Sequence, residues 1–326
     1  MIFRFLIAAT VLLITSEFAA AQQDYAIVIH GGAGVMSKAA MSEERQAEYK
    51  LKLEEALNLG ETMLKNGATS TETVVEVIKI LENSPLFNAG KGAVFTAAGE
   101  NELDASIMEG KNLNAGAIAG VKDIKNPIEA ARTVMEKSEH VLLSGKGASE
   151  FAKEQGLEIV KNKYFFTSSR YESLQRIQQQ ERERTPSDNS GTVGCVALDV
   201  YGNLCAGTST GGMTNKKYGR IGDSPVIGAG NYADNKTCAV SCTGHGEYYI
   251  RLGFARDIAA LMEYKNLSVE EACAEEIRKL GELGGTGGVI ALDAKGNVSM
   301  EFNTGGMFRG YLKSSGEKEI AIFAEE

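Results

Sequence analysis

The sequence is short of the residues on which many common active sites depend. Its 326 residues include no tryptophan, 4 prolines and only 3 histidines, which are His30, His140 and His245. Neither a Gly-x-x-x-x-Gly-Lys-Ser/Thr phosphate loop nor a His-Glu-x-x-His zinc motif occurs. These absences exclude the usual signatures of P-loop nucleotide hydrolases and zinc peptidases, so any chemistry must be supplied by other residues.

Positive charge is also in short supply. Lys and Arg number 34 against 43 Asp and Glu, which gives a net charge of −9. A negatively charged chain has no electrostatic attraction for nucleic acid or for an anionic membrane surface, and we expect neither as a partner. By contrast, glycine is abundant at 37 residues, and hydrophobic residues make up 43% of the chain. This composition indicates a folded globular protein with many tight turns.

Long apolar runs are limited to the N-terminus. Arg4 precedes an apolar segment, residues 5–14, and three small alanines follow at 19–21. This order is typical of a secretory signal peptide, and the apolar run is too short to span a bilayer. We therefore expect residues 1–21 to be removed during export to the periplasm or the cell exterior.

Cysteine is present in an odd number, five. Export permits disulfides, but an odd count in a chain of this length does not indicate a disulfide framework. Cys195, Cys205, Cys238 and Cys242 lie in apolar, strand-like segments, and we expect buried free thiols there. Cys238 and Cys242 have the spacing of metal ligands, but no second pair completes a site. We therefore expect no metal–thiolate centre.

The pattern of apolar residues predicts alternating groups of strands and helices. Two segments, 196–203 and 290–297, each place Asp, Gly and Asn between apolar runs, which is typical of a tight hairpin turn. Strands in both halves with helices between them indicate a layered α/β fold. The expected strands are 25–30, 103–108, 115–121, 140–143, 192–198, 286–293, 297–303 and 319–324, and the expected helices are 42–65, 70–81, 127–135, 246–263 and 268–283.

One long polar segment interrupts this pattern. Residues 172–190 are strongly polar and charged, and an apolar strand follows directly from Thr192. Long polar loops inside a compact domain are uncommon and are often functional or disordered. We expect a mobile linker over residues 160–191.

Thr192 becomes chemically distinctive if the chain is cut before it. A threonine hydroxyl is a poor nucleophile unless a base removes its proton. A free α-amine on the same residue has a pKa of about 7.7–8.0, which suits a general base near neutral pH. Cleavage between Gly191 and Thr192 would therefore give one residue both the nucleophile and its base, and no histidine would be needed.

A series of motifs occurs in a specific order along the chain. They are His30-Gly-Gly-Ala-Gly34, Leu86 to Phe95, Glu102 to Gly110, Thr192 to Asp199, Thr208 to Met213, Gly219 to Pro225, Gly228 to Asp234 and Cys242 to Glu247. Together they resemble the plant-type asparaginase/isoaspartyl peptidase family of N-terminal-nucleophile hydrolases over residues 25–310. The resemblance implies a four-layer αββα sandwich that cuts itself before Thr192. The α subunit (22–191) and the β subunit (192–326) would stay together, and two such pairs would form a dimer.

The same resemblance implies roles for five residues of the catalytic centre. Thr192 would be the nucleophile, Thr210 its hydroxyl neighbour, and Asn88 a supporting residue nearby. Thr243 and Gly244 would form the oxyanion hole, in which donors face the negative charge that develops during the reaction.

Three further residues are implied for substrate binding. Arg220 would bind the α-carboxylate of the substrate and Asp223 its α-amine, with Gly212 also in contact with the substrate. Arginine can bind a carboxylate through two parallel hydrogen bonds, and Arg220 and Asp223 lie in one glycine-bounded loop. Opposite charges in one loop suit the zwitterionic head of an amino acid.

The resemblance implies no catalytic cofactor and one structural sodium ion. Backbone carbonyl oxygens would hold the ion, so it would play no part in the reaction. These carbonyls belong to Leu81, Glu82, Ser84, Phe87, Ala89 and Lys91.

The implied reaction is hydrolysis of a β-aspartyl amide. After cutting the chain, Thr192 would attack the side-chain amide of asparagine or the β-linked bond of an isoaspartyl dipeptide. A β-aspartyl ester would form, and water would release aspartate. One alternative is a glycosylasparaginase, whose members more often have Asn-Gly where this chain has Gly211-Gly212. Another, from a different class, is an exported amino-acid-binding protein that is never cut.

Overall fold

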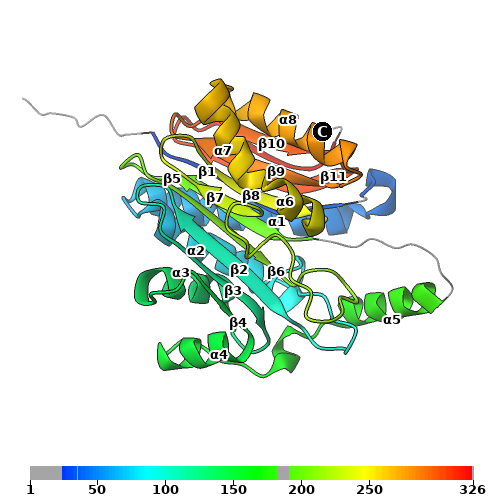
Figure 1. Ribbon diagram of the computed structural model, residues 1–326. Coiled ribbons are helices and arrows are strands. Elements are labelled where there is room, and N and C mark those ends of the chain that lie inside the picture. Colours follow the sequence, from blue (N-terminus) through cyan, green and yellow to red (C-terminus); the bar gives the residue numbers. More distant parts are fainter. Residues whose placement is uncertain (1–23, 35, 183–190, 325–326) are drawn as a thin grey trace, which may run out of the picture.

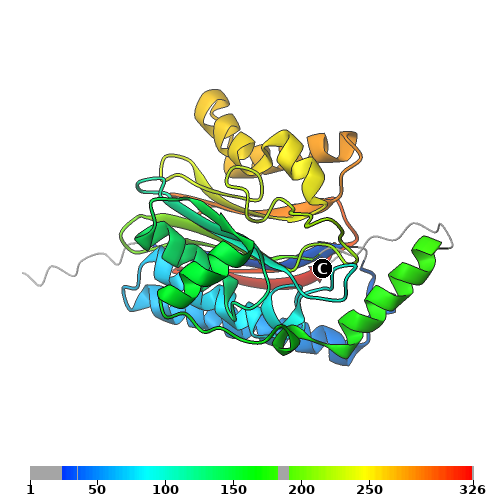
Figure 2. The same ribbon diagram turned by 60° about the horizontal axis from the view of Figure 1, so that its bottom comes forward.

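Two β-sheets pack face to face at the centre of the computed structural model, which describes residues 24–34, 36–182 and 191–324 (Figures 1 and 2). The larger sheet has the order β12 (Lys318–Phe323), β11 (Gly306–Lys313), β1 (Ala26–Gly34), β5 (Val193–Leu198), β6 (Leu204–Thr210), β2 (Leu103–Glu109), β3 (Ala115–Val121) and β4 (Leu142–Ser144). The smaller sheet has the order β10 (Val298–Phe302), β9 (Gly287–Asp293), β8 (Cys238–Gly244) and β7 (Asn231–Ala233). The mixed α/β class expected from the sequence is confirmed.

Helices cover the outer face of each sheet (Figure 2). The larger sheet is covered by α1 (Glu43–Lys65), α2 (Ser70–Glu82), α3 (Pro127–Lys137) and α4 (Gly145–Glu154). The smaller sheet is covered by α7 (Phe254–Lys265) and α8 (Val269–Glu282), with α6 (Gly246–Leu252) packed against both of these helices. A further helix, α5 (Ser168–Arg182), extends from one end of the molecule (Figure 1). Membrane spanning would need a longer or more apolar helix than any that the structure describes.

The central strands of the larger sheet are buried on both faces, which explains why β1 and β5 have apolar residues at successive positions. In β1, Ile27 and Ile29 belong to the core beneath the helices, while Ala26 and Val28 belong to the core between the sheets. Successive side chains of a strand point to opposite faces, so both sets must be apolar. The central strands are therefore rigid supports for any residue placed at their ends.

The two predicted hairpin turns are confirmed. In each turn an aspartate, Asp199 or Asp293, accepts hydrogen bonds at 2.8–3.0 Å through Oδ1 from the backbone N–H groups two and four residues later. Asp199 also accepts a bond at 2.9 Å from the N–H of Ser70, the first residue of α2. The turn after β5 is thereby tied to the helical layer.

The five cysteines are buried free thiols, as expected for four of them. Burial in apolar surroundings raises the pKa of these thiols and keeps them protonated. The buried set is Cys195, Cys205, Cys238, Cys242 and Cys273.

Several elements differ from the sequence prediction. Strands β7 and β11 and helix α4 were not expected, and the helix expected over 246–263 is divided at Gly253, whose φ is +62°. Strand β11 contains two glycines and a lysine, which are poor strand formers, but it pairs with β1 on one side and β12 on the other. Tertiary pairing, rather than local preference, creates this strand.

Part of the expected linker is an ordered helix. Helix α5 lies within the segment 160–191, and its Leu174 and Ile177 side chains are buried. These are the two apolar residues of the polar tract, three positions apart, and they lie on one face of the helix. Residues 168–182 of the expected linker therefore form a helix. Residues 183–190, like the signal peptide expected over 1–21, lie outside the described part of the chain.

Candidate active site

Thr192 lies at the start of β5, the strand between β1 and β6 in the larger sheet. Thr192 is buried, with only 5% of its surface exposed. The position is enclosed by β1 and β6, because Gly194 pairs with His30 on one side and with Thr208 on the other. A Cβ atom on Gly194 would lie 2.2 Å from His30 Nε2, so only glycine admits this histidine.

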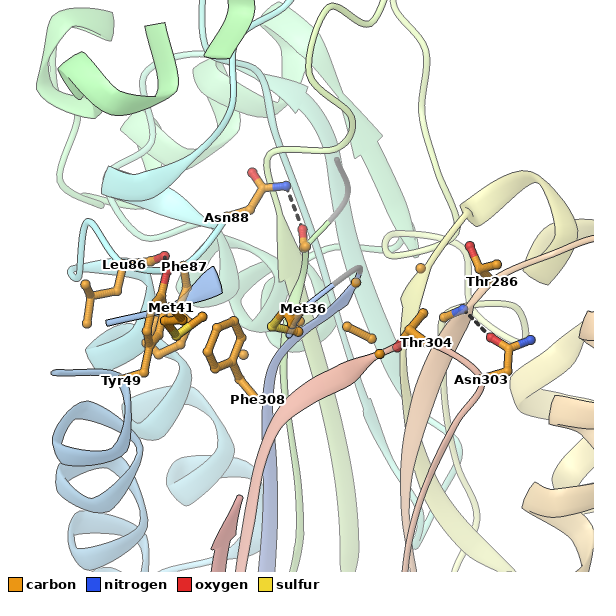
Figure 3. Close-up of a pocket in the computed structure, with 18 of the residues that line it drawn as sticks. Met36, Met41, Tyr49, Leu86, Phe87, Asn88, Thr286, Asn303, Thr304 and Phe308 are labelled. Atoms are coloured by element: carbon orange, nitrogen blue, oxygen red, sulfur yellow. Dashed lines mark hydrogen bonds between the residues drawn. The ribbon is translucent and has the colours of Figure 1, made fainter. Parts of the chain in front are cut away.

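The peptide bond between Gly191 and Thr192 is held in a network of side chains. The Gly191 carbonyl oxygen accepts a hydrogen bond at 2.6 Å from Asn88 Nδ2 and one at 3.2 Å from the Thr210 hydroxyl. The Thr192 hydroxyl donates to the Thr210 oxygen at 3.1 Å. Figure 3 shows the Asn88 amide pointing at this carbonyl from one side. Two donors thus polarise the carbonyl, and the Thr192 hydroxyl lies in the same network.

Asn88 and Thr210 are themselves fixed by the backbone. Asn88 Nδ2 also donates to the Gly212 carbonyl at 2.7 Å, while Asn88 Oδ1 accepts from the Val94 N–H at 2.9 Å. The Gly212 N–H donates to the Thr210 hydroxyl at 3.0 Å, and Gly212 has a φ of +79°, which favours glycine. The Asn88 amide and the Thr210 hydroxyl, which both donate to the Gly191 carbonyl, are therefore each fixed in a single orientation. The sequence resemblance placed Asn88, Thr210 and Gly212 here, and the structure brings them together.

His30 is a buried neutral residue behind the nucleophile. Its Nδ1 lies 3.0 Å from the Thr192 carbonyl oxygen, which can only accept, so Nδ1 carries the proton. Nε2 then accepts from the Ser241 hydroxyl at 3.0 Å, and Ser241 in turn lies 2.7 Å from the Thr208 hydroxyl. Burial lowers the pKa of His30 to about 3. Sequence reasoning gave His30 no role, although its motif was recognised.

Arg220 and Asp223 lie close together but do not pair directly. A Cβ atom on Gly246 would lie 2.6 Å from Asp223 Oδ1 and 3.1 Å from Arg220 Nη2, so both side chains approach this glycine. Arg220 instead pairs with Glu247 through two hydrogen bonds of 2.8 Å, from Nε and Nη2. Glu247 was not predicted as a site residue, although it ends a recognised motif. A carboxylate therefore already occupies the fork of the guanidinium group.

Asp223 is a buried carboxyl group with a free oxygen. Its Oδ2 is buried and has no hydrogen-bond partner among the described residues. Burial raises the pKa of Asp223 to about 7, although a hydrogen bond from its own backbone N–H and the charge of Arg220 act in the opposite direction. An oxygen in this state can accept a hydrogen bond from an ammonium group, which would compensate the cost of burial.

Two cavities lie beside the Gly191–Thr192 peptide bond, one lined by Gly191 and the other by Thr192. A small one of about 10 Å³ is lined by Thr192, Thr210, Arg220 and Asp223, among others. A cavity of that volume holds at most one water molecule, so the space between these four residues is closed in this structure. A much larger cavity of about 480 Å³ lies beyond Gly191 (Figure 3).

Thr243 and Gly244 end strand β8 beside these cavities. Gly244 lines both cavities and has a φ of +150°, and a Cβ atom there would lie 2.4 Å from the Thr286 carbonyl oxygen. The Thr243 hydroxyl is fully buried and accepts a hydrogen bond at 3.4 Å from the Ala33 N–H. The structure therefore places Gly244 next to Thr192, whereas the Thr243 hydroxyl already has a backbone donor.

The loop expected to hold sodium contains free carbonyl oxygens. Those of Leu81 and Ala89 accept hydrogen bonds from later backbone N–H groups. Within the described ranges, no hydrogen bond reaches the carbonyls of Glu82, Ser84, Phe87 and Lys91. Acidic and imidazole metal ligands are not clustered anywhere in these ranges.

A threonine at the start of a central strand, with its own preceding carbonyl polarised, is the arrangement of an enzyme that uses an N-terminal nucleophile. The chain belongs to the asparaginase family, since the model of that family, described as Asparaginase, matches residues 23–322. The family resemblance seen in the sequence is confirmed.

Three relatives cover nearly the same length of chain. The isoaspartyl peptidase of Escherichia coli is 48% identical, over 92% of this chain and 96% of the relative. The putative isoaspartyl peptidase/L-asparaginase of Dictyostelium discoideum is also 48% identical, over 88% of this chain and 92% of the relative. The probable isoaspartyl peptidase/L-asparaginase 2 of Arabidopsis thaliana is 43% identical, over 92% of this chain and 99% of the relative.

The neutral state of His30 predicts a pH-dependent stability. The folded-state pKa of about 3 lies below the unfolded value of about 6.5, so on acidification the unfolded chain takes up a proton first. The stabilisation is present above about pH 6.5 and is lost as the pH falls towards 3. Relative to His30→Gln, which cannot titrate, the unfolding free energy should fall by up to about 1.4 kcal/mol per pH unit.

Urea denaturation of both proteins at equal concentration, from about pH 7 to about pH 4, measures this difference. Other titrating groups such as Glu82 and Asp223 are present in both proteins and cancel in the comparison. A difference that does not change with pH would contradict the assignment of a buried neutral His30.

Proposed function

We propose that this protein is an exported isoaspartyl peptidase/L-asparaginase that matures by cutting its own chain between Gly191 and Thr192. The observation that carries the proposal is the polarised Gly191 carbonyl, which accepts from both Asn88 and Thr210 while the Thr192 hydroxyl joins the same network. A peptide carbonyl in an ordinary strand has no need of two fixed side-chain donors.

The hydrogen bonds define a route for the proton during self-cleavage. The Thr192 hydroxyl donates to Thr210, and the Thr210 hydroxyl donates to the Gly191 carbonyl oxygen. As the Thr192 oxygen attacks the Gly191 carbon, one proton can pass along this chain to the oxygen that becomes negative, while Asn88 stabilises the same oxygen. As the tetrahedral intermediate collapses, that proton passes from the oxygen to the Thr192 nitrogen and the C–N bond breaks, which leaves an ester on Thr192 with its α-amine free. Water hydrolyses the ester and completes maturation.

The sheet topology explains how the two fragments would remain together. Fragment 22–191 supplies β1 and β2, and fragment 192–326 supplies β5 and β6 between them, with β11 on the other side of β1. Strands of the two fragments are thus hydrogen-bonded to each other at three boundaries of the larger sheet. The stacked sheets and their outer helices correspond to the αββα sandwich of N-terminal-nucleophile hydrolases. We further propose that two such pairs form a dimer.

Cleavage would give Thr192 the base that it needs for turnover. The free α-amine accepts the hydroxyl proton, and the hydroxyl oxygen attacks the side-chain amide carbon of the substrate. The substrate carbonyl would replace that of Gly191, with Thr243 and Gly244 as donors to its oxygen. The substrate C–N bond then breaks, and the Thr192 ammonium group gives its proton to the leaving amine, so that ammonia or an amino acid departs and a β-aspartyl ester remains. Water hydrolyses this ester, with the amine acting again as base, and releases aspartate.

Arg220 and Asp223 would hold the aspartyl part of the substrate. Because Glu247 already occupies the Arg220 fork, the α-carboxylate must displace or share that partner, and the small cavity must widen. The free Asp223 Oδ2 would accept from the α-ammonium group. The printed names of the relatives support β-aspartyl substrates over a glycosylated asparagine. Export rests on the predicted signal peptide over 1–21.

A structural sodium ion fits the loop that follows α2. The free carbonyls of Glu82, Ser84, Phe87 and Lys91 are hard oxygen donors, which suit such an ion. A Cβ atom on Gly90 would lie 2.4 Å from the Glu82 carbonyl oxygen, so glycine is needed for this tight loop. Leu81 and Ala89 complete the proposed set. The ion would fix the loop that carries Asn88 and would take no part in the reaction.

Self-cleavage is tested by mass spectrometry and denaturing gels of the purified protein. We expect two fragments, the smaller beginning at Thr192, and a single uncut chain for Thr192→Ala because the attacking hydroxyl is lost. Thr192→Ser keeps a hydroxyl and should be cut more slowly. An uncut wild-type chain would contradict the proposal and favour the amino-acid-binding alternative.

The role of Asp223 predicts pH-dependent binding of the product, aspartate. Asp223 must be ionised to bind the α-ammonium group, and burial raises its pKa to about 7. Below that pH the affinity should weaken by up to about tenfold per pH unit relative to Asp223→Asn, which cannot titrate. Calorimetric titration of both mature proteins measures the effect, and parallel pH profiles would contradict it.

A further inference from the structure

The larger cavity lies where the leaving group of a substrate would be. Gly191 lines this cavity and Gly244 lines both cavities, whereas Arg220 and Asp223 line only the small one. A substrate with its aspartyl part at Arg220 and its acyl carbon at Thr192 would therefore direct its leaving amine into the larger cavity. Its volume of about 480 Å³ exceeds what ammonia, the leaving group of asparagine, requires.

One wall of this cavity is apolar and aromatic (Figure 3). Tyr49 stacks on Phe308 with ring centroids 4.0 Å apart, and Phe87 meets the Tyr49 ring edge-on at 5.5 Å. Met41 and Leu86 lie on the same side as these rings in Figure 3. Such a wall stabilises an apolar side chain by removing it from water.

Arg170 supplies a positive charge to the same cavity. Its Nε donates to the Gly92 carbonyl at 3.0 Å and its Nη2 to the Leu86 carbonyl at 3.3 Å. No carboxylate within the described ranges forms an ion pair with Arg170. A guanidinium group has five N–H donors, so donors remain for a carboxylate that arrives with a ligand.

The position of Arg170 does not depend on the bond that is cut. Helix α5 is anchored by the buried Leu174 and Ile177 side chains and by a bond of 3.1 Å from Gln178 Nε2 to the Ala97 carbonyl. Glu181 near its end pairs with Lys217 at 2.6 Å, across the two proposed fragments. The helix would therefore keep Arg170 at the cavity after maturation.

We propose that this cavity binds the residue that leaves, with Arg170 on its free carboxylate and the aromatic wall around its side chain. Among the β-aspartyl peptides of the proposed function, those with a free carboxylate on an apolar second residue would be cut fastest. This inference rests on the proposed function and adds to it the residue that selects the leaving group. Arg170 would be a specificity residue that contacts the leaving group and leaves the reacting atoms untouched.

The wild-type protein tests the proposal without any substitution. We expect kcat/KM for β-aspartyl-leucine to exceed that for its C-terminal amide by about tenfold, because the amide removes the charge that Arg170 would bind. The acid should also exceed β-aspartyl-glycine by about tenfold, because glycine has no side chain to bury. Equal rates for the acid and the amide would overturn the proposal.

Substitution at Arg170 then locates the effect. Arg170→Gln should reduce the acid-to-amide ratio to about one, measured on protein shown to be correctly cut. Arg176→Gln is the matched control, since Arg176 lies on the same helix and donates to Ser173 at 3.1 Å on an exposed surface. We expect it to keep the wild-type ratio. A ratio unchanged by Arg170→Gln would overturn the role of this residue.

Asparagine hydrolysis separates this proposal from the proposed function. Hydrolysis of asparagine with no discrimination between acid and amide would refute the leaving-group site alone. Failure to hydrolyse asparagine and every β-aspartyl peptide would refute the proposed function itself.

Discussion

The whole site depends on the Gly191 carbonyl group, which two side-chain hydrogen bonds hold in one orientation. Asn88 and Thr210 both donate to the Gly191 oxygen, and the Thr192 hydroxyl donates to Thr210. The two donors are fixed in turn by the backbone around Gly212 and Val94. Since Thr192 begins a strand that is paired on both sides, the bond can be neither withdrawn nor rotated without disturbing the larger sheet.

The small cavity beside Thr192, Arg220 and Asp223 is almost closed in this structure. It has room for about one water molecule, and Glu247 occupies the carboxylate fork of Arg220. Burial raises the pKa of Asp223 and so disfavours its ionised form, and one of its carboxyl oxygens, Oδ2, has no hydrogen-bond partner among the described residues. A bound α-ammonium group would donate a hydrogen bond to this oxygen and compensate the free-energy cost of burying it unpaired, which would favour binding of an amino-acid head.

Much of this arrangement could be predicted from the sequence, and the failures have physical reasons. Motif order identified Thr192 and Arg220, and Asp-Gly-Asn turns marked both hairpins, because turn chemistry is local. Strand β11 could not be predicted, since its pairing with β1 and β12 arises from distant segments. Sequence spacing also cannot show that Arg220 forms its ion pair with Glu247, 27 residues away, and not with Asp223. The hydrogen-bond network of His30 joins Thr192, Ser241 and Thr208, which lie far apart in the sequence and come together only in the fold.

Thr192 would carry the aspartyl part of the substrate as an ester during turnover. The most direct measurement is rapid acid quenching of the mature protein during turnover of β-aspartyl-leucine, followed by peptide mass spectrometry. We expect a β-aspartyl ester on the peptide that begins at Thr192, and none on any other peptide. Turnover with no ester at Thr192 under these conditions, or with an adduct on a different residue, would contradict the central claim.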